Sequence, residues 1–184
     1  MTDDSLQIKI PGKLFVAGEY AVLEPNQQAI VVAVDRYITA DVSPSQRNSI
    51  ALPQLGFDLI TWDKDKNNKI TFSKSDQRLR YIQQSIIVAS QFLREKSIEL
   101  HPIHIEISSN LYDSSGRKYG LGSSAAIVVA VITSILKVST RGMYQPKHKD
   151  IYKLSAIAHY RVQGNGSAAD IAASTYGGWL CYSV

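Results

Sequence analysis

The chain has 184 residues, of which 45% are hydrophobic and 20% are charged, values typical of a globular protein with its own core. Its net charge of +4 suits anionic small molecules, while the absence of a run of Lys and Arg argues against a nucleic-acid partner. The four histidines show no ligand spacing with acidic residues or with the single cysteine, so the sequence indicates no metal site built on histidine or cysteine.

The sequence predicts a cytoplasmic protein with no membrane partner. Cys181 is the only cysteine, which excludes an intrachain disulfide and fits a reducing compartment. Because Cys181 lies in an apolar run, we expect it to pack as a small hydrophobic residue. Acidic residues near the amino terminus argue against a signal peptide, and the longest apolar run, 125–132, is too short to span a bilayer.

Strand predictions come from alternation of apolar and polar residues. The predicted strands are 6–10, 29–34, 37–42, 102–109 and 178–184. Residues 43–80 are polar and irregular, and we expect them to form a peripheral hairpin or flap. Two short strand candidates within this segment are 57–62 and 69–72.

Helix predictions come from apolar residues recurring at helical spacing. The predicted helices are 77–96, 123–136, 149–161 and a short helix from 168. Together with the strands, they indicate an α+β fold in one compact domain. The chain ends inside the last predicted strand without a helix cap or turn residues, so we expect residues 1–184 to be a fragment of a longer protein.

The most informative motif is the sequence GLGSSAA at 120–126, directly before the apolar helix. Glycines allow the backbone to approach a ligand closely, and the first turn of a helix offers free N–H groups to a phosphate. Serine hydroxyls at the same place can contact a phosphate oxygen or a magnesium ion. A capped buried helix whose glycines only permit a turn explains the motif equally well when it is considered alone.

Two other nucleotide motifs fit less well. A Walker A loop requires Gly-Lys followed by Ser or Thr, which the segment lacks. The dinucleotide pattern G-x-G-x-x-A does match from Gly120 to Ala125, but it requires a preceding strand and an acidic residue about 20 positions later. Here a polar loop precedes the motif, and no Asp or Glu occurs between Asp113 and Asp150.

Three ordered segments together are more specific than one glycine loop. PGKLFVAGEYAVLE at 11–24, KYGLGSSAA at 118–126 and GNGSAADIAASTYGGW at 164–179 resemble the GHMP kinase family. The resemblance implies the amino-terminal domain of that family, with a fold like ribosomal protein S5 domain 2. It also implies a second, ferredoxin-like domain with a further glycine-rich motif, which these 184 residues do not contain.

Within the family, the segments look most like the phosphomevalonate kinases, with mevalonate kinases and other GHMP kinases as alternatives. The mevalonate kinase pattern has Gly-Glu-His where this chain has Gly18-Glu19-Tyr20, and it carries a magnesium-binding Glu on the helix before the catalytic Asp. Residues 154–163 contain no acid. The implied reaction is transfer of the γ-phosphoryl group of ATP to 5-phosphomevalonate, which gives 5-diphosphomevalonate for isoprenoid synthesis.

The resemblance also assigns roles to individual residues. The catalytic pair is Lys13, expected at the end of a strand, and Asp170, expected at the start of a short helix. The nucleotide site comprises Lys118, Gly120, Leu121, Gly122, Ser123, Ser124 and Ala125. Ser124 is also the magnesium ligand, so the implied cofactors are ATP and Mg2+. The acceptor site comprises Glu19, Tyr20, Asn165 and Ser167. A solvated loop position for Lys118 and plain packing for Tyr20 are the alternatives.

The expected partner is a small molecule, phosphomevalonate, and neither nucleic acid nor a membrane. We expect the isolated domain to bind nucleotide weakly, to have little activity and to form homo-oligomers through an exposed interdomain surface. The alternative from another class is a non-catalytic, S5-like nucleic-acid-binding domain, against which the lack of a basic stripe and of stacking aromatics argues.

Overall fold

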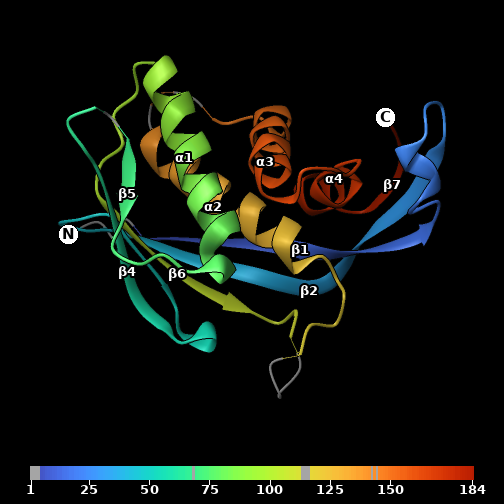
Figure 1. Ribbon diagram of the computed structural model, residues 1–184, viewed down its shortest axis with the longest axis horizontal. Coiled ribbons are helices and arrows are strands. Elements are labelled where there is room, and N and C mark those ends of the chain that lie inside the picture. Colours follow the sequence, from blue (N-terminus) through green and yellow to red (C-terminus); the bar gives the residue numbers. More distant parts are fainter. Residues whose placement is uncertain (1–4, 68, 113–116, 142, 144) are drawn as a thin grey trace.

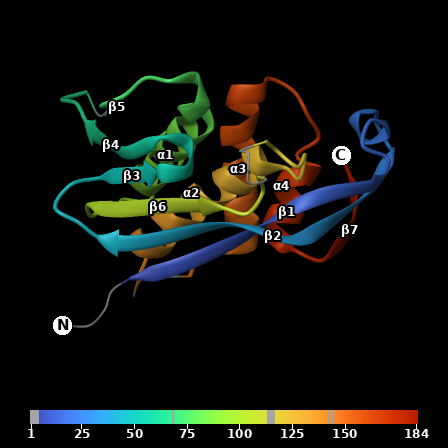
Figure 2. The ribbon, with the colours of Figure 1, turned by 90° about the horizontal axis from the view of Figure 1, so that it is seen from below.

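The computed structural model describes residues 5–67, 69–112, 117–141, 143 and 145–184. Four α-helices pack on one face of a seven-stranded sheet (Figure 1). Seen from below, the strands lie in front and the helices behind them (Figure 2). The strand order is β1-β2-β6-β3-β4-β5, and β7 pairs with one end of β2. The predicted α+β class is confirmed.

The elements follow the predicted order along the chain. The strands are β1 (Leu6–Ala17), β2 (Gln28–Pro44), β3 (Ser49–Leu52), β4 (Phe57–Lys64), β5 (Ile70–Phe72), β6 (Ile103–Ser109) and β7 (Trp179–Ser183). The helices are α1 (Arg80–Glu95), α2 (Ser123–Ser139), α3 (His148–Gln163) and α4 (Ala169–Tyr176), with 3-10 turns η1 (Ala21–Leu23), η2 (Pro53–Leu55) and η3 (Gln77–Leu79). No helix of the described residues is both long and apolar enough to cross a membrane.

The two strands expected around Asp35 and Arg36 are one continuous strand, β2. Pro11 of β1 lies opposite Tyr37, while the next residue, Gly12, lies opposite Val34. Asp35 and Arg36 of β2 therefore have no opposite residue in β1 and form a bulge. A bulge adds residues to one strand without ending the pairing. Prediction from polarity alone took this bulge for a break.

The expected peripheral flap at 43–80 was partly wrong. β3 pairs in parallel with β6 inside the main sheet, and all four of its residues are buried. β4 and β5 do form a hairpin, but Phe57, Ile60 and Trp62 of β4 lie in the core. A four-residue strand covered on both sides shows no alternation, so its pattern could not be distinguished from a loop.

The core lies between the sheet and the helix layer. α2 contacts α1, α3, β1 and β2, and 12 of its 17 residues are buried. α1 instead buries one stripe, including Ile86 and Leu93, as its amphipathic sequence predicts. The central, nearly all-apolar helix α2 is thus fixed on several sides, which holds its amino-terminal end in a defined position.

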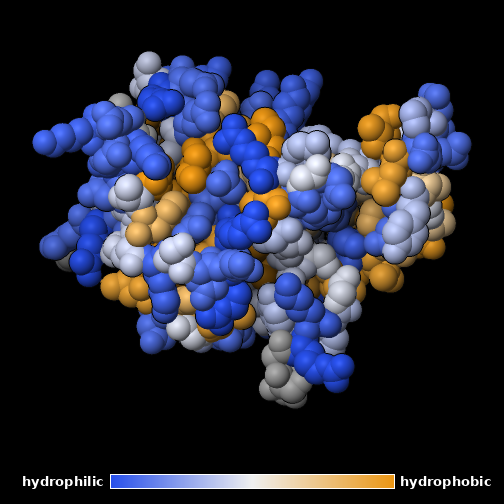
Figure 3. Space-filling model, viewed as in Figure 1, coloured by the Kyte–Doolittle hydropathy of each residue, from blue (hydrophilic) through white to orange (hydrophobic). Residues whose placement is uncertain are grey.

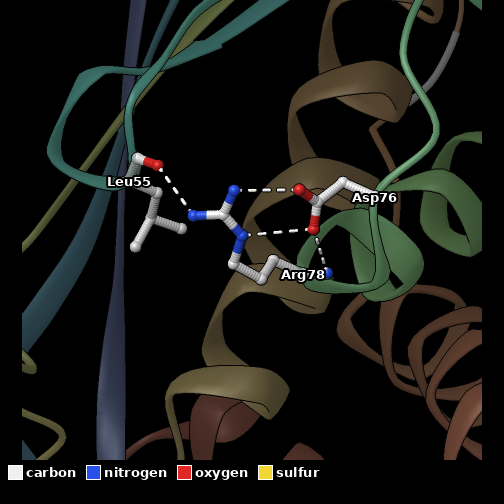
Figure 4. A network of polar contacts seen from close by, with 3 residues as sticks. All are labelled: Leu55, Asp76 and Arg78. Carbon is white, nitrogen blue, oxygen red and sulfur yellow. Dashed lines mark hydrogen bonds and ion pairs between the residues drawn. The ribbon is translucent and has the colours of Figure 1, made fainter.

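The entry to α1 is fixed by a polar network with three members (Figure 4). The Asp76 carboxylate accepts hydrogen bonds from the backbone N–H of Arg78 at 2.8 Å and from its guanidinium at 2.8 and 3.1 Å. The same guanidinium donates to the Leu55 carbonyl at 3.2 Å and lies over the Phe57 ring. These hydrogen bonds to Arg78 hold the pKa of Asp76 at about 2, below its usual value.

This network makes a pH-dependent prediction for stability. The folded-state pKa of Asp76 lies below its unfolded value, so the carboxylate stabilises the fold above the unfolded pKa and loses that effect as the pH falls through about 2. Asp76→Asn retains a capping side chain but removes the charge. We expect it to lower the unfolding free energy at neutral pH, with a difference that shrinks between about pH 4 and pH 2.

Urea unfolding of both proteins across that pH range measures the difference. Asp58→Asn, on the exposed side of β4, is the control for loss of one surface carboxylate. A penalty for Asp76→Asn that does not change with pH would contradict the assignment of the stabilisation to the ionised form.

Cys181 is exposed on β7 rather than packed as a hydrophobic residue, which corrects the expectation from its apolar neighbours. It pairs across the strands with Ile30 of β2, which is also exposed. The apolar run did not predict burial of Cys181, because one face of the sheet is uncovered at β7.

Candidate active site

Lys13 lies in the middle of β1, not at the end of a strand as expected. Its backbone N–H donates to the Leu121 carbonyl at 2.8 Å, which ties the strand to the glycine segment. Its side chain is only 12% exposed, with Nζ 4.6 Å from the centre of the Phe15 ring and 3.9 Å from Glu19 Oε1. The ammonium group is therefore held close to the protein surface instead of extending into water.

Gly122 explains how the lysine side chain reaches the start of α2. This residue caps the helix with a φ of +74°, a left-handed conformation that glycine adopts without strain. A Cβ placed there would lie 2.8 Å from Cγ and 3.0 Å from Cε of Lys13. The aliphatic part of Lys13 thus occupies the space that a larger residue at 122 would need.

The first turn of α2 is the candidate phosphate site. In an α-helix the first N–H groups have no acceptor within the helix, and the dipole favours an anion there. These groups belong to Ser123, Ser124 and Ala125. Gly120 precedes them with a φ of +79°, and no atom lies within 4 Å of the position of a Cβ, so the backbone is open on that side. The geometry fits nucleotide phosphates.

The other two residues predicted for the nucleotide site, Leu121 and Lys118, have different surroundings. Leu121 is half-buried and supplies the carbonyl bound by Lys13. Lys118 is exposed and forms an isolated antiparallel β-bridge with Tyr112. Part of the polar loop expected at 110–118, residues 113–116, lies outside the described residues. The Lys118 side chain is exposed to solvent, and its role in nucleotide binding stays a prediction.

Ser124 is joined to two helices by a histidine. Its hydroxyl lies 3.3 Å from Nε2 of His159 on α3, and the imidazole stacks on the Tyr81 ring of α1 with centroids 5.0 Å apart. His159 is only 5% exposed, and burial lowers the pKa of its imidazole, while the nearby Asp170 charge opposes this shift. The ring is therefore favoured in its neutral form, with one nitrogen free to accept.

Asp170 lies in the first turn of α4, as predicted. Its Oδ1 accepts a hydrogen bond at 2.9 Å from the N–H of Ile171, which leaves acceptor capacity for other groups. The residue lines a cavity of about 380 Å3 together with His159, Asn165 and Gly166. His159 therefore belongs both to this cavity and to the Ser124 contact, which connects the two parts of the candidate site.

The structure brings together only some of the residues predicted for the acceptor site. Asn165 lines the cavity beside Asp170. The Ser167 hydroxyl accepts from the N–H of Ala169 at 3.3 Å, and the Ser167 carbonyl accepts from the Tyr182 hydroxyl at 2.6 Å. Tyr182 also lies 2.7 Å from the Tyr152 hydroxyl, and burial with this hydrogen bond raises the pKa of Tyr182 far above its usual value. In this structure Ser167 supports the start of α4.

Glu19 and Tyr20 follow the end of β1. Glu19 pairs with Lys13, as described above. Tyr20 is 81% exposed, so plain packing, the alternative considered for it, does not occur. Its aromatic ring is therefore open to solvent.

A magnesium ion fits this site only as part of a nucleotide complex. The described residues contain no group of three or more His, Cys, Asp and Glu side chains that could hold a metal. Mg2+ commonly binds to few protein oxygens and completes its shell with water and phosphate. The Ser124 hydroxyl at the start of α2 fits that role, because phosphates bound there would bring the ion to it.

His159 and Tyr81 were not predicted from the sequence. The histidine lies eleven positions before Asp170 on a helix that also carries exposed polar residues, so its spacing pointed to no partner. Its contacts depend on how α1, α2 and α3 pack against one another. The one available signal was a histidine on the buried stripe of a helix directly before the Asp170 segment.

Comparisons with known proteins identify the family. Residues 80–178 match the model of the GHMP kinases N terminal domain, more than half of the chain. A phosphomevalonate kinase of Streptomyces sp. is 33% identical over 95% of this chain and 48% of its own length. The curated relatives also include archaeal mevalonate kinases.

Solved structures give the same result. The Lin0012 protein from Listeria innocua has a TM-score of 0.86 and 41% identity, covering 98% of this chain and 49% of its own. The Streptococcus pneumoniae phosphomevalonate kinase, in complex with phosphomevalonate and AMPPNP, has a TM-score of 0.76 and 27% identity, covering 93% of this chain and 47% of its own.

The fold and the site define an α+β domain with a lysine held against the amino terminus of a buried helix. The chain belongs to the GHMP kinase family, as the amino-terminal domain of such a kinase. It spans about half the length of the relatives it matches.

Gly122 provides a direct test of the site's geometry. Gly122→Ala adds a Cβ that collides with Lys13 and imposes left-handed strain of about 1–2 kcal/mol. We expect the variant of the complete protein to bind Mg-nucleotide at least about tenfold more weakly, because both the lysine and the first turn must move. Gly56→Ala is the matched control, with a φ of +75° but nothing within 4 Å of its Cβ.

Calorimetry of nucleotide binding and thermal unfolding separate the two effects. Both variants should lose the stability that left-handed strain costs, Gly122→Ala should lose more because Lys13 must move, and only Gly122→Ala should lose affinity. Equal nucleotide affinity in the two variants would show that contact between Lys13 and residue 122 is unimportant for binding.

Proposed function

We propose that the complete protein is a cytoplasmic, magnesium-dependent phosphomevalonate kinase. It would transfer the γ-phosphoryl group of ATP to 5-phosphomevalonate and release ADP and 5-diphosphomevalonate. The observation that carries the proposal is the position of the Lys13 side chain against Gly122, at the amino-terminal end of α2. A cation at this position would lie beside phosphate groups bound at the start of the helix.

The reaction itself requires mainly positioning and neutralisation of charge. An oxygen of the acceptor phosphate forms a bond to the γ-phosphorus as the bond from that phosphorus to the bridging β–γ oxygen breaks, and ADP leaves with that oxygen. The second pKa of a phosphomonoester is about 6, so the attacking oxygen is already ionised at neutral pH. Lys13 would offset the charge of both phosphates, and Asp170 would orient Lys13 and the acceptor. Magnesium bound with ATP supplies further neutralisation of the β- and γ-phosphates.

The choice of a phosphorylated acceptor rests on the charges around the cavity. Among the described residues that line it, Asp170 is the only acid, and Arg161 is also present. Residue 159, which lies between the cavity and Ser124, is a histidine rather than an acid. A cavity with few negative charges suits a dianionic phosphate ester better than one with two carboxylates would. The similarity to phosphomevalonate kinases also supports this choice.

Competing acceptors test the assignment. Release of ADP by the complete protein should be measured with phosphomevalonate and with mevalonate under the same conditions. A higher kcat/KM for phosphomevalonate is expected. A higher value for mevalonate would move the assignment to mevalonate kinase, and no transfer to either acceptor would refute the proposal.

The two proposed catalytic residues give a second prediction. Lys13→Met and Asp170→Asn should each lower kcat by about 10²-fold or more, with smaller changes in KM, because their charges act mainly during transfer. Lys9→Met is the control, since Lys9 is an exposed lysine of the same strand. Unchanged turnover in Lys13→Met would make Lys13 an ordinary surface lysine. A steep acid limb in the wild-type rate that disappears in Asp170→Asn would instead indicate a base at Asp170.

We also propose that the complete protein has a second domain that completes the nucleotide and acceptor sites. The half-length match to the relatives and the family resemblance support it. Phosphoryl transfer depends on positioning, and a site open on one side positions its substrates poorly. Residues 1–184 alone should therefore bind nucleotide weakly and turn over little substrate.

An uncovered apolar surface makes a prediction for the isolated chain. Leu14, Ile30 and Trp179 lie on the sheet face opposite α4, are 43–70% exposed, and lie where β1, β2 and β7 meet. Hydrophobic surface is also exposed at the right-hand end of the molecule, which holds β7 (Figure 3). Exposed patches of this kind favour association. We expect residues 1–184 to self-associate at micromolar concentration, as measured by light scattering, and Trp179→Ser to reduce this. Leu59→Ser, at another exposed apolar site on β4, should have no effect. Self-association unchanged by Trp179→Ser would place the contact elsewhere.

A further inference from the structure

We propose that His159 is a positioning residue that holds the Ser124 hydroxyl in place for the bound Mg-nucleotide. The inference rests on the proposed function, because it assumes that the start of α2 receives the nucleotide phosphates. His159 carries neither a carboxylate nor a thiol. In this proposal it acts through the Ser124 side chain and not on the reacting atoms.

The first argument is the fixed place of the imidazole. His159 is 95% buried, and its ring is held between two partners on different helices, the Tyr81 ring at 5.0 Å and the Ser124 hydroxyl at 3.3 Å. A side chain packed in this way has few alternative rotamers. The position of its Nε2 is thus determined by the packing of three helices.

The second argument is what Ser124 needs. A serine hydroxyl at the first turn of a helix can rotate to donate to nearby carbonyl groups or to water. Ser124 lies one residue into α2, where a fixed hydroxyl would help bind a phosphate–metal complex. A hydrogen bond to Nε2 selects one rotation and leaves the other side of the oxygen available. His159 thus orders Ser124 before the nucleotide arrives, which lowers the entropy cost of binding.

The third argument is the position of His159 between two regions. The same residue lines the cavity that contains Asp170 and Asn165. His159 therefore borders the proposed acceptor region and, through Nε2, contacts Ser124 of the proposed nucleotide region.

The test is a double-mutant cycle in the complete protein. His159→Phe retains a ring that stacks on Tyr81 but removes the hydrogen bond, and Ser124→Ala removes the other partner. Each should weaken binding of Mg-AMPPNP about 3- to 10-fold, as expected for the loss of one hydrogen bond. If His159 acts through Ser124, His159→Phe should cause little further loss in the Ser124→Ala background, because the effects of coupled residues do not add.

A conservative variant and a matched control complete the design. His159→Gln places an amide near the position of Nε2 and should recover most of the affinity lost in His159→Phe. His104→Phe removes a comparable contact, the 2.8 Å hydrogen bond between His104 and Ser49 in the β3–β6 pair, and should leave nucleotide affinity unchanged. Thermal unfolding of all variants reports general loss of stability.

The outcomes separate this inference from the proposed function. Wild-type protein that binds no Mg-nucleotide would refute the proposed function and its site. Wild-type protein that binds nucleotide, with additive effects of His159→Phe and Ser124→Ala or no rescue by Gln, would overturn the role of His159 alone. Non-additive effects with rescue would support it even if the acceptor proved to be another molecule.

Discussion

The hydrogen bond from the Lys13 N–H to the Leu121 carbonyl is the contact on which the rest of the site depends. It holds β1 against the segment that begins α2, so that the lysine side chain and the helix start face the same space. This approach needs two residues without side chains. A Cβ at Gly12 would lie 2.7 Å from the Leu121 oxygen, and a Cβ at Gly122 would lie 2.8 Å from Lys13 Cγ. The glycines are thus required by the close contact of strand and loop, apart from any ligand.

The burial of α2 fixes this local geometry relative to the rest of the molecule. An apolar helix that contacts the sheet on one side and α1 and α3 on others cannot shift without disturbing the core. Its first turn is therefore a rigid platform. Ser124 connects it to His159, and the cavity beside His159 connects it to Asp170 on α4. Four elements distant in sequence form one site because a single helix is packed on several sides.

Prediction from the sequence failed where burial removed the usual pattern. β3 is buried on both sides and only four residues long, so nothing in its sequence separated it from the surrounding loops. The bulge at Asp35 and Arg36 appeared as a gap because polar residues there interrupt an apolar run, although the strand continues. The prediction for Cys181 was wrong for another reason: Leu180 and Tyr182 pack against α4, while Cys181 lies on the opposite, uncovered face of β7.

The sequence by itself determined the class of fold, the order of the four helices along the chain, and the segments around Lys13, Gly120–Gly122 and Asp170, because glycine spacing and hydrophobic periodicity are local properties. It also indicated the family through the order of three such segments. Only the tertiary structure decided that Lys13 lies within a strand and that Ser167 supports α4. It alone brought His159 and Tyr81 to Ser124. Those contacts depend on the packing of α1, α2 and α3, and the position of one helix against another is not encoded in the pattern of either alone.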